Sequence, residues 1–346
     1  MSNKRFFVPI IISAFIILAA GFAIYVVIGV GKGTIRLGNS NVREVSFVRK
    51  DNELSSSGKW NEGVIEYNGE KYVYKSGIRT YLIMGVDREG PATAAENYVS
   101  GGQSDVMFLL VVDKSTQSIS VIPINRNTMT KIRLCDPEGN YYGTFTAQIC
   151  LQHGYGDGLK GSCQKSVEAV SKLFYDIPIT GYMSFNMDAM SILNRLAGGV
   201  TLEVAEDIDY PDLDVRLTKG ETVTLTDDEA YAYIRYRDVN DFGTANRRLE
   251  REKQYALAAY NQLTEIVGGD RSKAIDMFKE LEPYVVTNMV FGDLAADLIK
   301  YGFDSSKVYD IPGELVQGKK YEEFYVDKSA LYDIILSILY KNAGEN

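Results

Sequence analysis

Five arginines lie close together in the segment 233–255, which reads YIRYRDVNDFGTANRRLEREKQY. They are Arg235, Arg237, Arg247, Arg248 and Arg251. The whole chain is nevertheless acidic, with 46 Asp and Glu against 37 Lys and Arg and a formal net charge of −9. A general nucleic-acid binder neutralises phosphates with a basic surface, so this charge argues against that class of protein. A local group of guanidinium groups can still bind a small anion.

The end of the first helix in this region decides whether Arg235 and Arg237 can act together. A capping box at Thr226–Glu229 opens that helix. If the helix continued through Arg237, the two side chains would point about 200° apart. If it ends near Ile234 and the chain then extends, the period of two places both on one face. The Asp-, Asn- and Gly-rich segment that follows favours the second arrangement.

A second helix is predicted to start at residues 244–245 and to continue to about residue 267. Arg248 and Glu252, four residues apart, flank its apolar face, whereas Arg247 and Arg251 lie on the far side, where we expect them to be solvated. Arginines in a first helical turn oppose the helix dipole unless an anion is bound there. The alternative is a charged surface helix with an Arg248–Glu252 pair worth about 0.3–0.5 kcal/mol.

Apolar runs and helical patterns alternate from Thr80 onward and predict the fold class. TYLIMGVD, SDVMFLLVVD and SISVIPIN are nearly continuous apolar runs, typical of strands buried on both faces. Helical patterns occur at 166–176 and 186–198, and further ones follow after Gly268. Strands alternating with helices predict an α/β domain with α-β-α layers and a central mixed sheet.

Polar residues at the ends of these strands are candidate ligands, because open α/β sheets bind ligands outside their strand ends. Asp87 follows the first run, Asp105 begins the second, and Arg126 follows the third between two asparagines. Two carboxylates and an arginine in one place would suit a divalent cation with phosphate oxygens. Each such aspartate can alternatively cap a helix or turn, as we expect for Asp113.

The N-terminal segment predicts a membrane anchor. Residues 6–31 contain no charge, and 26 residues of helix exceed the roughly 30 Å of bilayer hydrocarbon. The segment is longer than the apolar region of about 7–15 residues in a cleaved signal peptide, which is the alternative. Lys4 and Arg5 orient residues 1–5 toward the cytoplasm. We therefore expect a single-pass protein with an extracellular stalk at 32–77, containing a hairpin at Asn68–Gly69, and an extracellular domain at 78–346.

The cysteines and the single histidine limit which disulfides, metal sites and catalytic triads the chain can form. Cys150 and Cys163 lie on either side of a Gly-rich stretch and could form a disulfide outside the cytoplasm; two buried free thiols are the alternative. The single His153 excludes a multi-histidine metal site. A nucleophilic triad built on His153 is less favoured than a structural histidine.

Together these residues resemble the LytR–CpsA–Psr family, membrane-anchored cell-wall proteins chiefly of Gram-positive bacteria. The resemblance extends from about Thr80 to Gln262 and follows the family's order. It comprises a strand ending in GVD, the strand start SDVM, an R-x-T turn, NMDA…LNRLAGGVTLEV, LTDDEAYAYIRYR and an R-x-x-R helix. It implies an extracytoplasmic α/β domain that holds a polyprenyl-linked pyrophosphate. Such a domain would transfer an anionic glycopolymer, of teichoic acid or capsule type, to peptidoglycan.

The resemblance also implies roles for individual residues. Asp87 and Asp105 would hold Mg²⁺, and Asp87 is the candidate base. An acceptor hydroxyl would attack the sugar-linked phosphorus, with polyprenyl phosphate leaving while arginines and metal neutralise its charge. The arginines that would bind the pyrophosphate are Arg126, Arg235, Arg237 and Arg248.

Several positions depart from the family pattern and leave other functions open. Gln103 stands where an arginine is usual, and Arg88 is the candidate to replace that charge. Glu252 stands where a glutamine is usual, next to the expected pyrophosphate. Asn127 replaces an aspartate, and the usual K-x-N-A-A-Y segment reads QICLQHGY from Gln148. One alternative is a non-catalytic protein that binds lipid carrier or wall polymer in regulation or scaffolding. A weaker one is a pyrophosphatase that uses water as the acceptor.

Overall fold

The computed structural model describes residues 64–238, 244–269, 272–289, 301 and 305–344. The predicted anchor at 6–31 and most of a helical pattern near 292–302 lie outside these ranges. Within them, none of the helices combines the length and the apolar character needed to span a bilayer.

A five-stranded sheet forms the centre of the domain, in the order β13-β8-β3-β4-β5. Strands β3 and β8 are parallel and the other neighbours are antiparallel, so the sheet is mixed, as predicted. The three apolar runs of the sequence form β3, β4 and β5. The strand bounds are β3 (Ile78–Val86), β4 (Ser104–Asp113), β5 (Ser118–Pro123), β8 (Gly181–Asn186) and β13 (Val285–Thr287).

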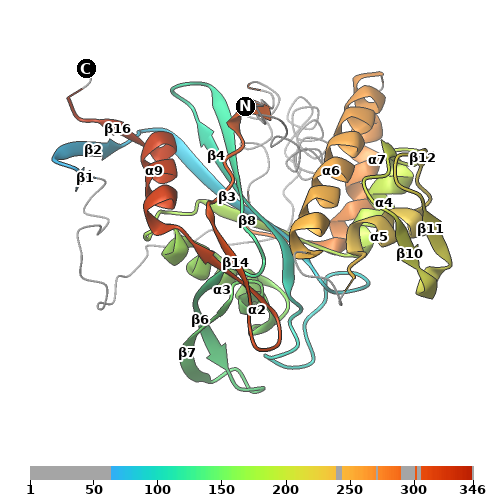
Figure 1. Ribbon diagram of the computed structural model, residues 1–346, viewed down its shortest axis with the longest axis horizontal. Coiled ribbons are helices and arrows are strands. Elements are labelled where there is room, and N and C mark those ends of the chain that lie inside the picture. The colour runs from blue at the N-terminus through green and yellow to red at the C-terminus, as the bar shows by residue number, and fades with distance from the viewer. Residues whose placement is uncertain (1–63, 239–243, 270–271, 290–300, 302–304, 345–346) are drawn as a thin grey trace, which may run out of the picture.

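Helices cover both faces of this sheet, which makes the predicted three layers (Figure 1). Alternate residues of β4 enter two separate cores: Phe108 and Leu110 face one, and Leu109 and Val111 face the other. The first core is closed by α4 (Asp188–Leu196), α5 (Asp227–Arg235), α6 (Thr244–Gly269) and α7 (Ser272–Leu281). The second is closed by α3 (Lys160–Leu173) and α9 (Lys328–Leu339).

Short strands and turns complete the first layer. β9 (Thr201–Glu203) pairs with β12 (Thr222–Thr224), and β10 (Ile208–Tyr210) pairs with β11 (Val215–Leu217). Three single 3₁₀ turns occur at η1 (Pro211–Leu213), η2 (Glu282–Tyr284) and η3 (Ser305–Lys307).

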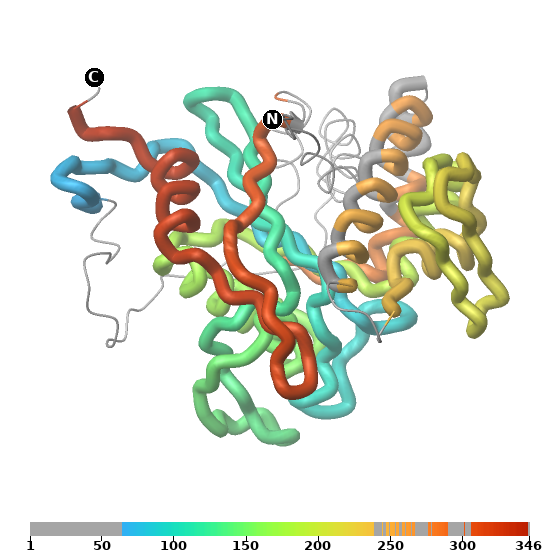
Figure 2. Tube along the Cα trace, in the orientation of Figure 1, coloured from blue at the N-terminus to red at the C-terminus, as the bar shows by residue number. Residues whose placement is uncertain are grey.

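Two hairpins that the sequence did not predict lie beside each other at one end of the sheet. β6 (Met129–Cys135) and β7 (Tyr141–Gln148) follow β5 and lead into the short helix α2 (Leu151–Gly154). β14 (Gly313–Gln317) and β15 (Glu322–Val326) come from the C-terminal part of the chain and lie against β6 (Figure 2). The backbone N–H of Phe324 donates to the carbonyl of Asn127 at 2.9 Å, just before β6. The C-terminal hairpin therefore contacts the loop that carries Arg126.

The hairpin predicted for the stalk belongs to the domain. β1 (Val64–Tyr67) and β2 (Glu70–Tyr74) turn at Asn68 and Gly69, whose φ angles of 50° and 81° fit the predicted type I′ turn. However, β2 also pairs with β16 (Tyr340–Asn342), and Ile65 is buried in the second core. The expected boundary at residues 77–78 is therefore misplaced, because burial of apolar side chains fixes the hairpin to the domain.

Helix ends differ from prediction where side chains cap them. α3 begins at Lys160 rather than residue 166, because the Asp157 carboxylate accepts from the N–H groups of Leu159, Gly161 and Ser162. The capping box at Thr226 and Glu229 is present, and α5 ends at Arg235, one residue beyond the expected end.

Candidate functional site

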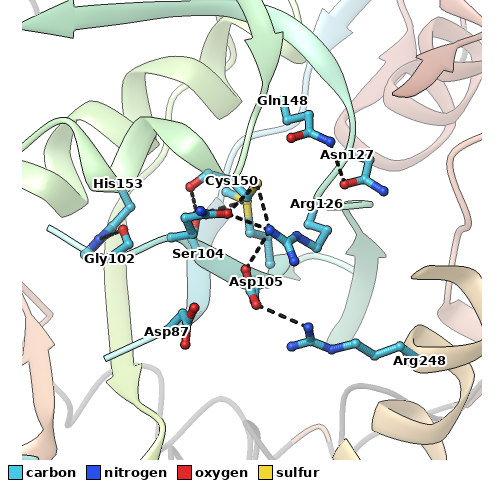
Figure 3. A network of polar contacts seen from close by, with 12 residues as sticks. Asp87, Gly102, Ser104, Asp105, Arg126, Asn127, Gln148, Cys150, His153 and Arg248 are labelled. Carbon is cyan, nitrogen blue, oxygen red and sulfur yellow. Dashed lines mark hydrogen bonds and ion pairs between the residues drawn. The ribbon is translucent and has the colours of Figure 1, made fainter. Parts of the chain in front are cut away.

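One edge of the central sheet collects three predicted site residues. Because β4 is antiparallel to both β3 and β5, the ends of β3 and β5 meet the start of β4. Asp87, Asp105 and Arg126 therefore lie at this edge (Figure 3). Asp113 lies at the other end of β4, where its Oδ1 accepts from the backbone N–H of Ser115 at 2.9 Å. Its predicted role as a turn residue is confirmed.

Asp105 is the extra residue of a β-bulge in β4. Gly85 pairs with Val106 and Val86 pairs with Ser104, so Asp105 is the additional residue between two paired neighbours. A bulge bends the strand and re-aims the side chain of its extra residue. The carboxylate of Asp105 accordingly contacts arginines instead of lying in the core below the sheet.

Arg126 and Arg248 lie on either side of Asp105 (Figure 3). Arg126 Nη2 donates to Gln103 Oε1 at 2.6 Å and is 3.6 Å from Cys150 Sγ. It is also 3.1 Å from Asp105 Oδ1, in an ion pair without hydrogen-bond geometry. Asp105 Oδ1 and Arg126 Nε are both buried and neither makes a hydrogen bond within the described residues. The hydrogen-bonding capacity of both atoms is therefore unused within the described residues.

Arg248 is buried together with Glu252, so the surface-helix interpretation is wrong for this pair. Arg248 is only 7 % exposed; its Nε donates to Glu252 Oε1 at 2.8 Å and its Nη1 to Asp105 Oδ2 at 3.2 Å. Burial alone would lower the pKa of Arg248, but the Glu252 and Asp105 carboxylates more than offset it, so the pKa is raised. Burial raises the pKa of Glu252 despite the opposing charge of Arg248.

Arg235 and Arg237 lie on either side of the residue where α5 gives way to extended chain. Tyr236 has φ −48° and ψ 132°, so the helix does not continue through Arg237. Arg235 Nη2 is 3.1 Å from Asp87 Oδ1. Arg237 Nη2 is 3.4 Å from Glu322 Oε2, and its Nε donates to Thr244 Oγ1 at 2.9 Å. The arrangement with the early helix end is the one observed.

Arg88 contacts Thr93 and Gly102 and not the other arginines of the site. Its Nη1 donates to the carbonyl of Thr93 at 2.7 Å, and its aliphatic part covers Gly102. A Cβ at Gly102 would lie 2.5 Å from Arg88 Cγ, and the φ of +80° there also favours glycine. Arg88 thus holds the loop before Gln103 and is not brought to Arg126.

Arg251 contradicts the expectation that it would be solvated. It is 2 % exposed, and its Nε donates to the carbonyl of Tyr233 at 2.8 Å. It also contacts Glu206 and the carbonyl of Tyr236. Arg247 is 41 % exposed and lies 3.3 Å from Glu206, so its predicted surface position is closer to what is observed.

The predicted disulfide does not form. Cys135, Cys150 and Cys163 are all free and buried, as in the alternative of buried thiols. Burial raises the pKa of Cys163 to about 12, and a thiol that stays protonated is a poor nucleophile. His153 Nδ1 lies 3.0 Å from the carbonyl oxygen of Gly101, and burial lowers its pKa to about 4. The histidine is buried and bonded to the backbone carbonyls of Gly101 and Gly102, which fits a structural role.

Glu322 is a site residue that no sequence motif indicated. Gln148 Nε2 donates to Asn127 Oδ1 at 2.9 Å and to the carbonyl of Glu322 at 2.8 Å. Asn127 Nδ2 in turn lies 3.4 Å from Glu322 Oε2. The amide at position 127 suits this place, because an aspartate there would set a second carboxylate beside the buried one of Glu322.

The carboxylates at the sheet edge fit a magnesium ion that is shared with phosphate. No group of three or more His, Cys, Asp or Glu side chains in the described part of the chain could hold a metal by itself. Magnesium commonly takes one or two carboxylates and completes its shell with water and substrate phosphates. Asp105 Oδ1, buried without a hydrogen bond, and the partly exposed Asp87 supply such a pair.

Comparisons with known proteins show which family the chain belongs to. The LytR_cpsA_psr family model matches residues 46–333. The chain is 28 % identical over 257 residues to the polyisoprenyl-teichoic acid–peptidoglycan teichoic acid transferase TagU of Bacillus subtilis, covering 73 % of this chain and 74 % of TagU. It is 30 % identical over 261 residues to the TagU of Bacillus licheniformis, with the same coverage.

Solved structures share the fold. Bacillus subtilis TagV superposes with a TM-score of 0.56 at 23 % identity, covering 76 % of this chain and 96 % of TagV. A structure of TagT bound to LI-WTA superposes with a TM-score of 0.52 at 18 % identity, covering 76 % of this chain and 90 % of TagT. The chain therefore belongs to the LytR_cpsA_psr family.

Proposed function

We propose that this protein transfers an anionic glycopolymer, of teichoic acid or capsule type, from a polyprenyl-pyrophosphate carrier to peptidoglycan by phosphotransfer. The observation that carries the proposal is the set of arginines gathered from a strand end, a helix end and a helix start beside two carboxylates. Those arginines are Arg126, Arg235, Arg237 and Arg248. The names of the TagU relatives describe transfer of teichoic acid to peptidoglycan, which supports the same reaction class.

The arginines would bind the pyrophosphate by exchanging carboxylate partners for phosphate oxygens. Arg126 Nε has no hydrogen-bond partner within the described residues, so it can bind an oxygen without losing a bond. Positive charge held in place beside the leaving group stabilises polyprenyl phosphate as it departs. A magnesium ion held by Asp87 and Asp105 would supply further neutralisation of the phosphate charge.

Asp87 is the proposed base for the acceptor hydroxyl. Its side chain is 37 % exposed, whereas Asp105 is buried, so an incoming glycan can reach Asp87. Before the ligand binds, its Oδ1 is ion-paired with Arg235 Nη2 at 3.1 Å, and exchange of that arginine to the pyrophosphate would free the carboxylate to act as the base. A base must lie within hydrogen-bonding reach of the proton that it takes, and only the exposed carboxylate meets this condition.

The proposed localisation places this chemistry where its substrates are. The uncharged segment 6–31 would anchor the chain in the membrane with residues 1–5 in the cytoplasm. The folded domain would then lie outside, next to the lipid carrier and the cell wall.

Transfer by the full-length protein in detergent tests the proposal. We expect transfer from a polyprenyl-pyrophosphate saccharide analogue to peptidoglycan in Mg²⁺, lost on chelation of the metal. Arg126→Ala and Arg237→Ala each remove a charge-assisted contact and should lower the rate at least about 100-fold. Arg133→Ala is the control, because Arg133 lies on β6 and the only role of its side chain in the described structure is a half-exposed ion pair with Glu168 of α3 and a contact with the exposed Tyr141 ring.

The same assay separates the alternatives. A wild-type protein that binds the analogue but transfers nothing would be a non-catalytic carrier-binding protein. Release of polyprenyl phosphate without peptidoglycan, at the same rate as with it, would identify a pyrophosphatase.

A further inference from the structure

Arg251 connects the two helices that carry the anion-binding arginines. It projects from α6, one turn after Arg248, and reaches the C-terminal end of α5. We infer that Arg251 is a positioning residue: it fixes the end of α5 and so aims Arg235 and Arg237 at the anion site. The inference rests on the proposed function only in that the anion is a pyrophosphate.

The contacts of Arg251 lie at the end of α5. The last carbonyls of any helix have no intrahelical donor. In α5 the N–H of Tyr236 closes the last turn on the carbonyl of Ala232. Arg251 then donates Nε to the carbonyl of Tyr233, at 2.8 Å, and Nη2 to that of Tyr236. One planar guanidinium therefore holds both ends of a four-residue stretch and also reaches Glu206, each through a different nitrogen, and the single nitrogen of a lysine does not reproduce this fork.

These contacts also orient the side chains next to Tyr236. The guanidinium carbon of Arg251 lies 5.4 Å from the centre of the Tyr236 ring, a cation–π contact that keeps this ring on the side of Arg251. Neighbouring side chains of an extended chain point to opposite sides. Arg237 is therefore directed away from Arg251, toward Glu322, which it reaches at 3.4 Å. Arg235, at the last position of α5, reaches Asp87 at 3.1 Å.

Glu206 makes the burial of this guanidinium tolerable. An unpaired buried charge is strongly destabilising, and here Glu206 Oε1 accepts a hydrogen bond from Arg251 Nη1. Glu206 lies in the loop between β9 and β10, so Arg251 connects this loop, as well as α6, to the end of α5. Arg247 shares Glu206 at 3.3 Å from its Nε, yet it is 41 % exposed. The two arginines thus share a counter-ion and helix but differ in burial.

The test measures pyrophosphate binding by the full-length protein in detergent with Mg²⁺. Arg251→Lys keeps the charge but loses the second carbonyl contact, so we expect the Kd for inorganic pyrophosphate and the KM for the lipid substrate to rise about tenfold. The melting curve should show a folded protein. Arg247→Lys is the matched control and should change Kd less than twofold.

A double-mutant cycle separates positioning from general stability. In a protein that already carries Arg235→Gln and Arg237→Gln, Arg251→Lys should weaken binding by less than about twofold, because its effect passes through those two arginines. A full tenfold further loss in that background would overturn the inference. If Arg251→Lys does not fold, Glu206→Gln takes its place in the cycle, with a smaller expected loss of about threefold and the same non-additivity.

The outcomes also distinguish this inference from the proposed function. Wild-type protein that binds no pyrophosphate would overturn the proposed function, and the inference with it. Wild-type binding that Arg251→Lys and Glu206→Gln leave unchanged would overturn the inference alone.

Discussion

Glu252 is a negative charge that lies next to the proposed anion site. A carboxylate beside a pyrophosphate site should repel the ligand, yet Glu252 is buried and receives a hydrogen bond from Arg248 Nε at 2.8 Å. Arg248 also contacts Asp105, so one guanidinium is shared by two carboxylates. The positive charge of Arg248 is therefore already compensated before a ligand binds, and this weakens its attraction for an anion.

Glu252→Gln should therefore strengthen pyrophosphate binding. The amide oxygen can still accept from Arg248, while the removed negative charge no longer opposes the ligand, so we expect the Kd to fall about tenfold. Titration calorimetry of inorganic pyrophosphate with Mg²⁺ measures it. Glu250→Gln makes the same charge change at an exposed position of the same helix and serves as control. A weaker Kd for Glu252→Gln than for the wild type would contradict this explanation.

At the scale of elements, the strands and helix starts that could be predicted from the sequence are those determined by interactions between neighbouring residues. The apolar runs of β3, β4 and β5 and the capping box of α5 could be read from neighbouring residues, because burial on both faces and helix capping act within a few positions. The candidate residues at the sheet edge followed from the general geometry of strand ends.

Contacts between distant segments could not be predicted from periodicity. Arg251 falls on the far side of the apolar face of α6, and the pattern predicts solvent there. Its partner Glu206 is 45 residues earlier, and only the fold shows that this side of the helix is covered. Glu322 is 195 residues from Asn127, on a hairpin with no site motif in its sequence. In both cases a charged residue that looks solvated is buried by an element from elsewhere in the chain.

The β14–β15 hairpin should contribute stability through Glu322. Glu322→Ala removes the carboxylate that faces Arg237 and Asn127, and we expect the free energy of unfolding to fall by about 2 kcal/mol. Glu323→Ala is the matched control: this neighbour bonds the Tyr325 hydroxyl at 2.6 Å near the surface, so its loss should cost no more than about 0.5 kcal/mol. Urea unfolding of both variants measures the difference, and equal losses would show that the buried carboxylate has no special role.

At the scale of the whole molecule, the two ends of the described chain are held together. β2 lies between β1 and β16, so residues near 70 and 340 share one small sheet. Aromatic contacts reinforce it: the rings of Tyr67 and Tyr332 lie 4.9 Å apart, and those of Tyr74 and Tyr340 5.3 Å apart. The first two strands and the last strand of the described chain therefore form one small sheet.

Removing the first hairpin should destabilise the entire domain. A protein that begins at residue 78 loses β1 and β2, including buried Ile65, and uncovers the tyrosines of α9 and β16. We expect it to be less stable by about 2–3 kcal/mol and to melt about 5 °C lower than a protein that begins at residue 64. Differential scanning calorimetry compares the two. Equal melting temperatures would show that the hairpin does not stabilise the domain and belongs to the stalk.

This pairing also sets an order of events during synthesis. β2 is synthesised long before its partner β16, so the three-stranded sheet cannot form until residues 340–342 have also emerged. In the meantime the tyrosines of the hairpin lack their partners. A chain cut before residue 340 would keep every arginine of the site and still lack β16, the strand that pairs with β2.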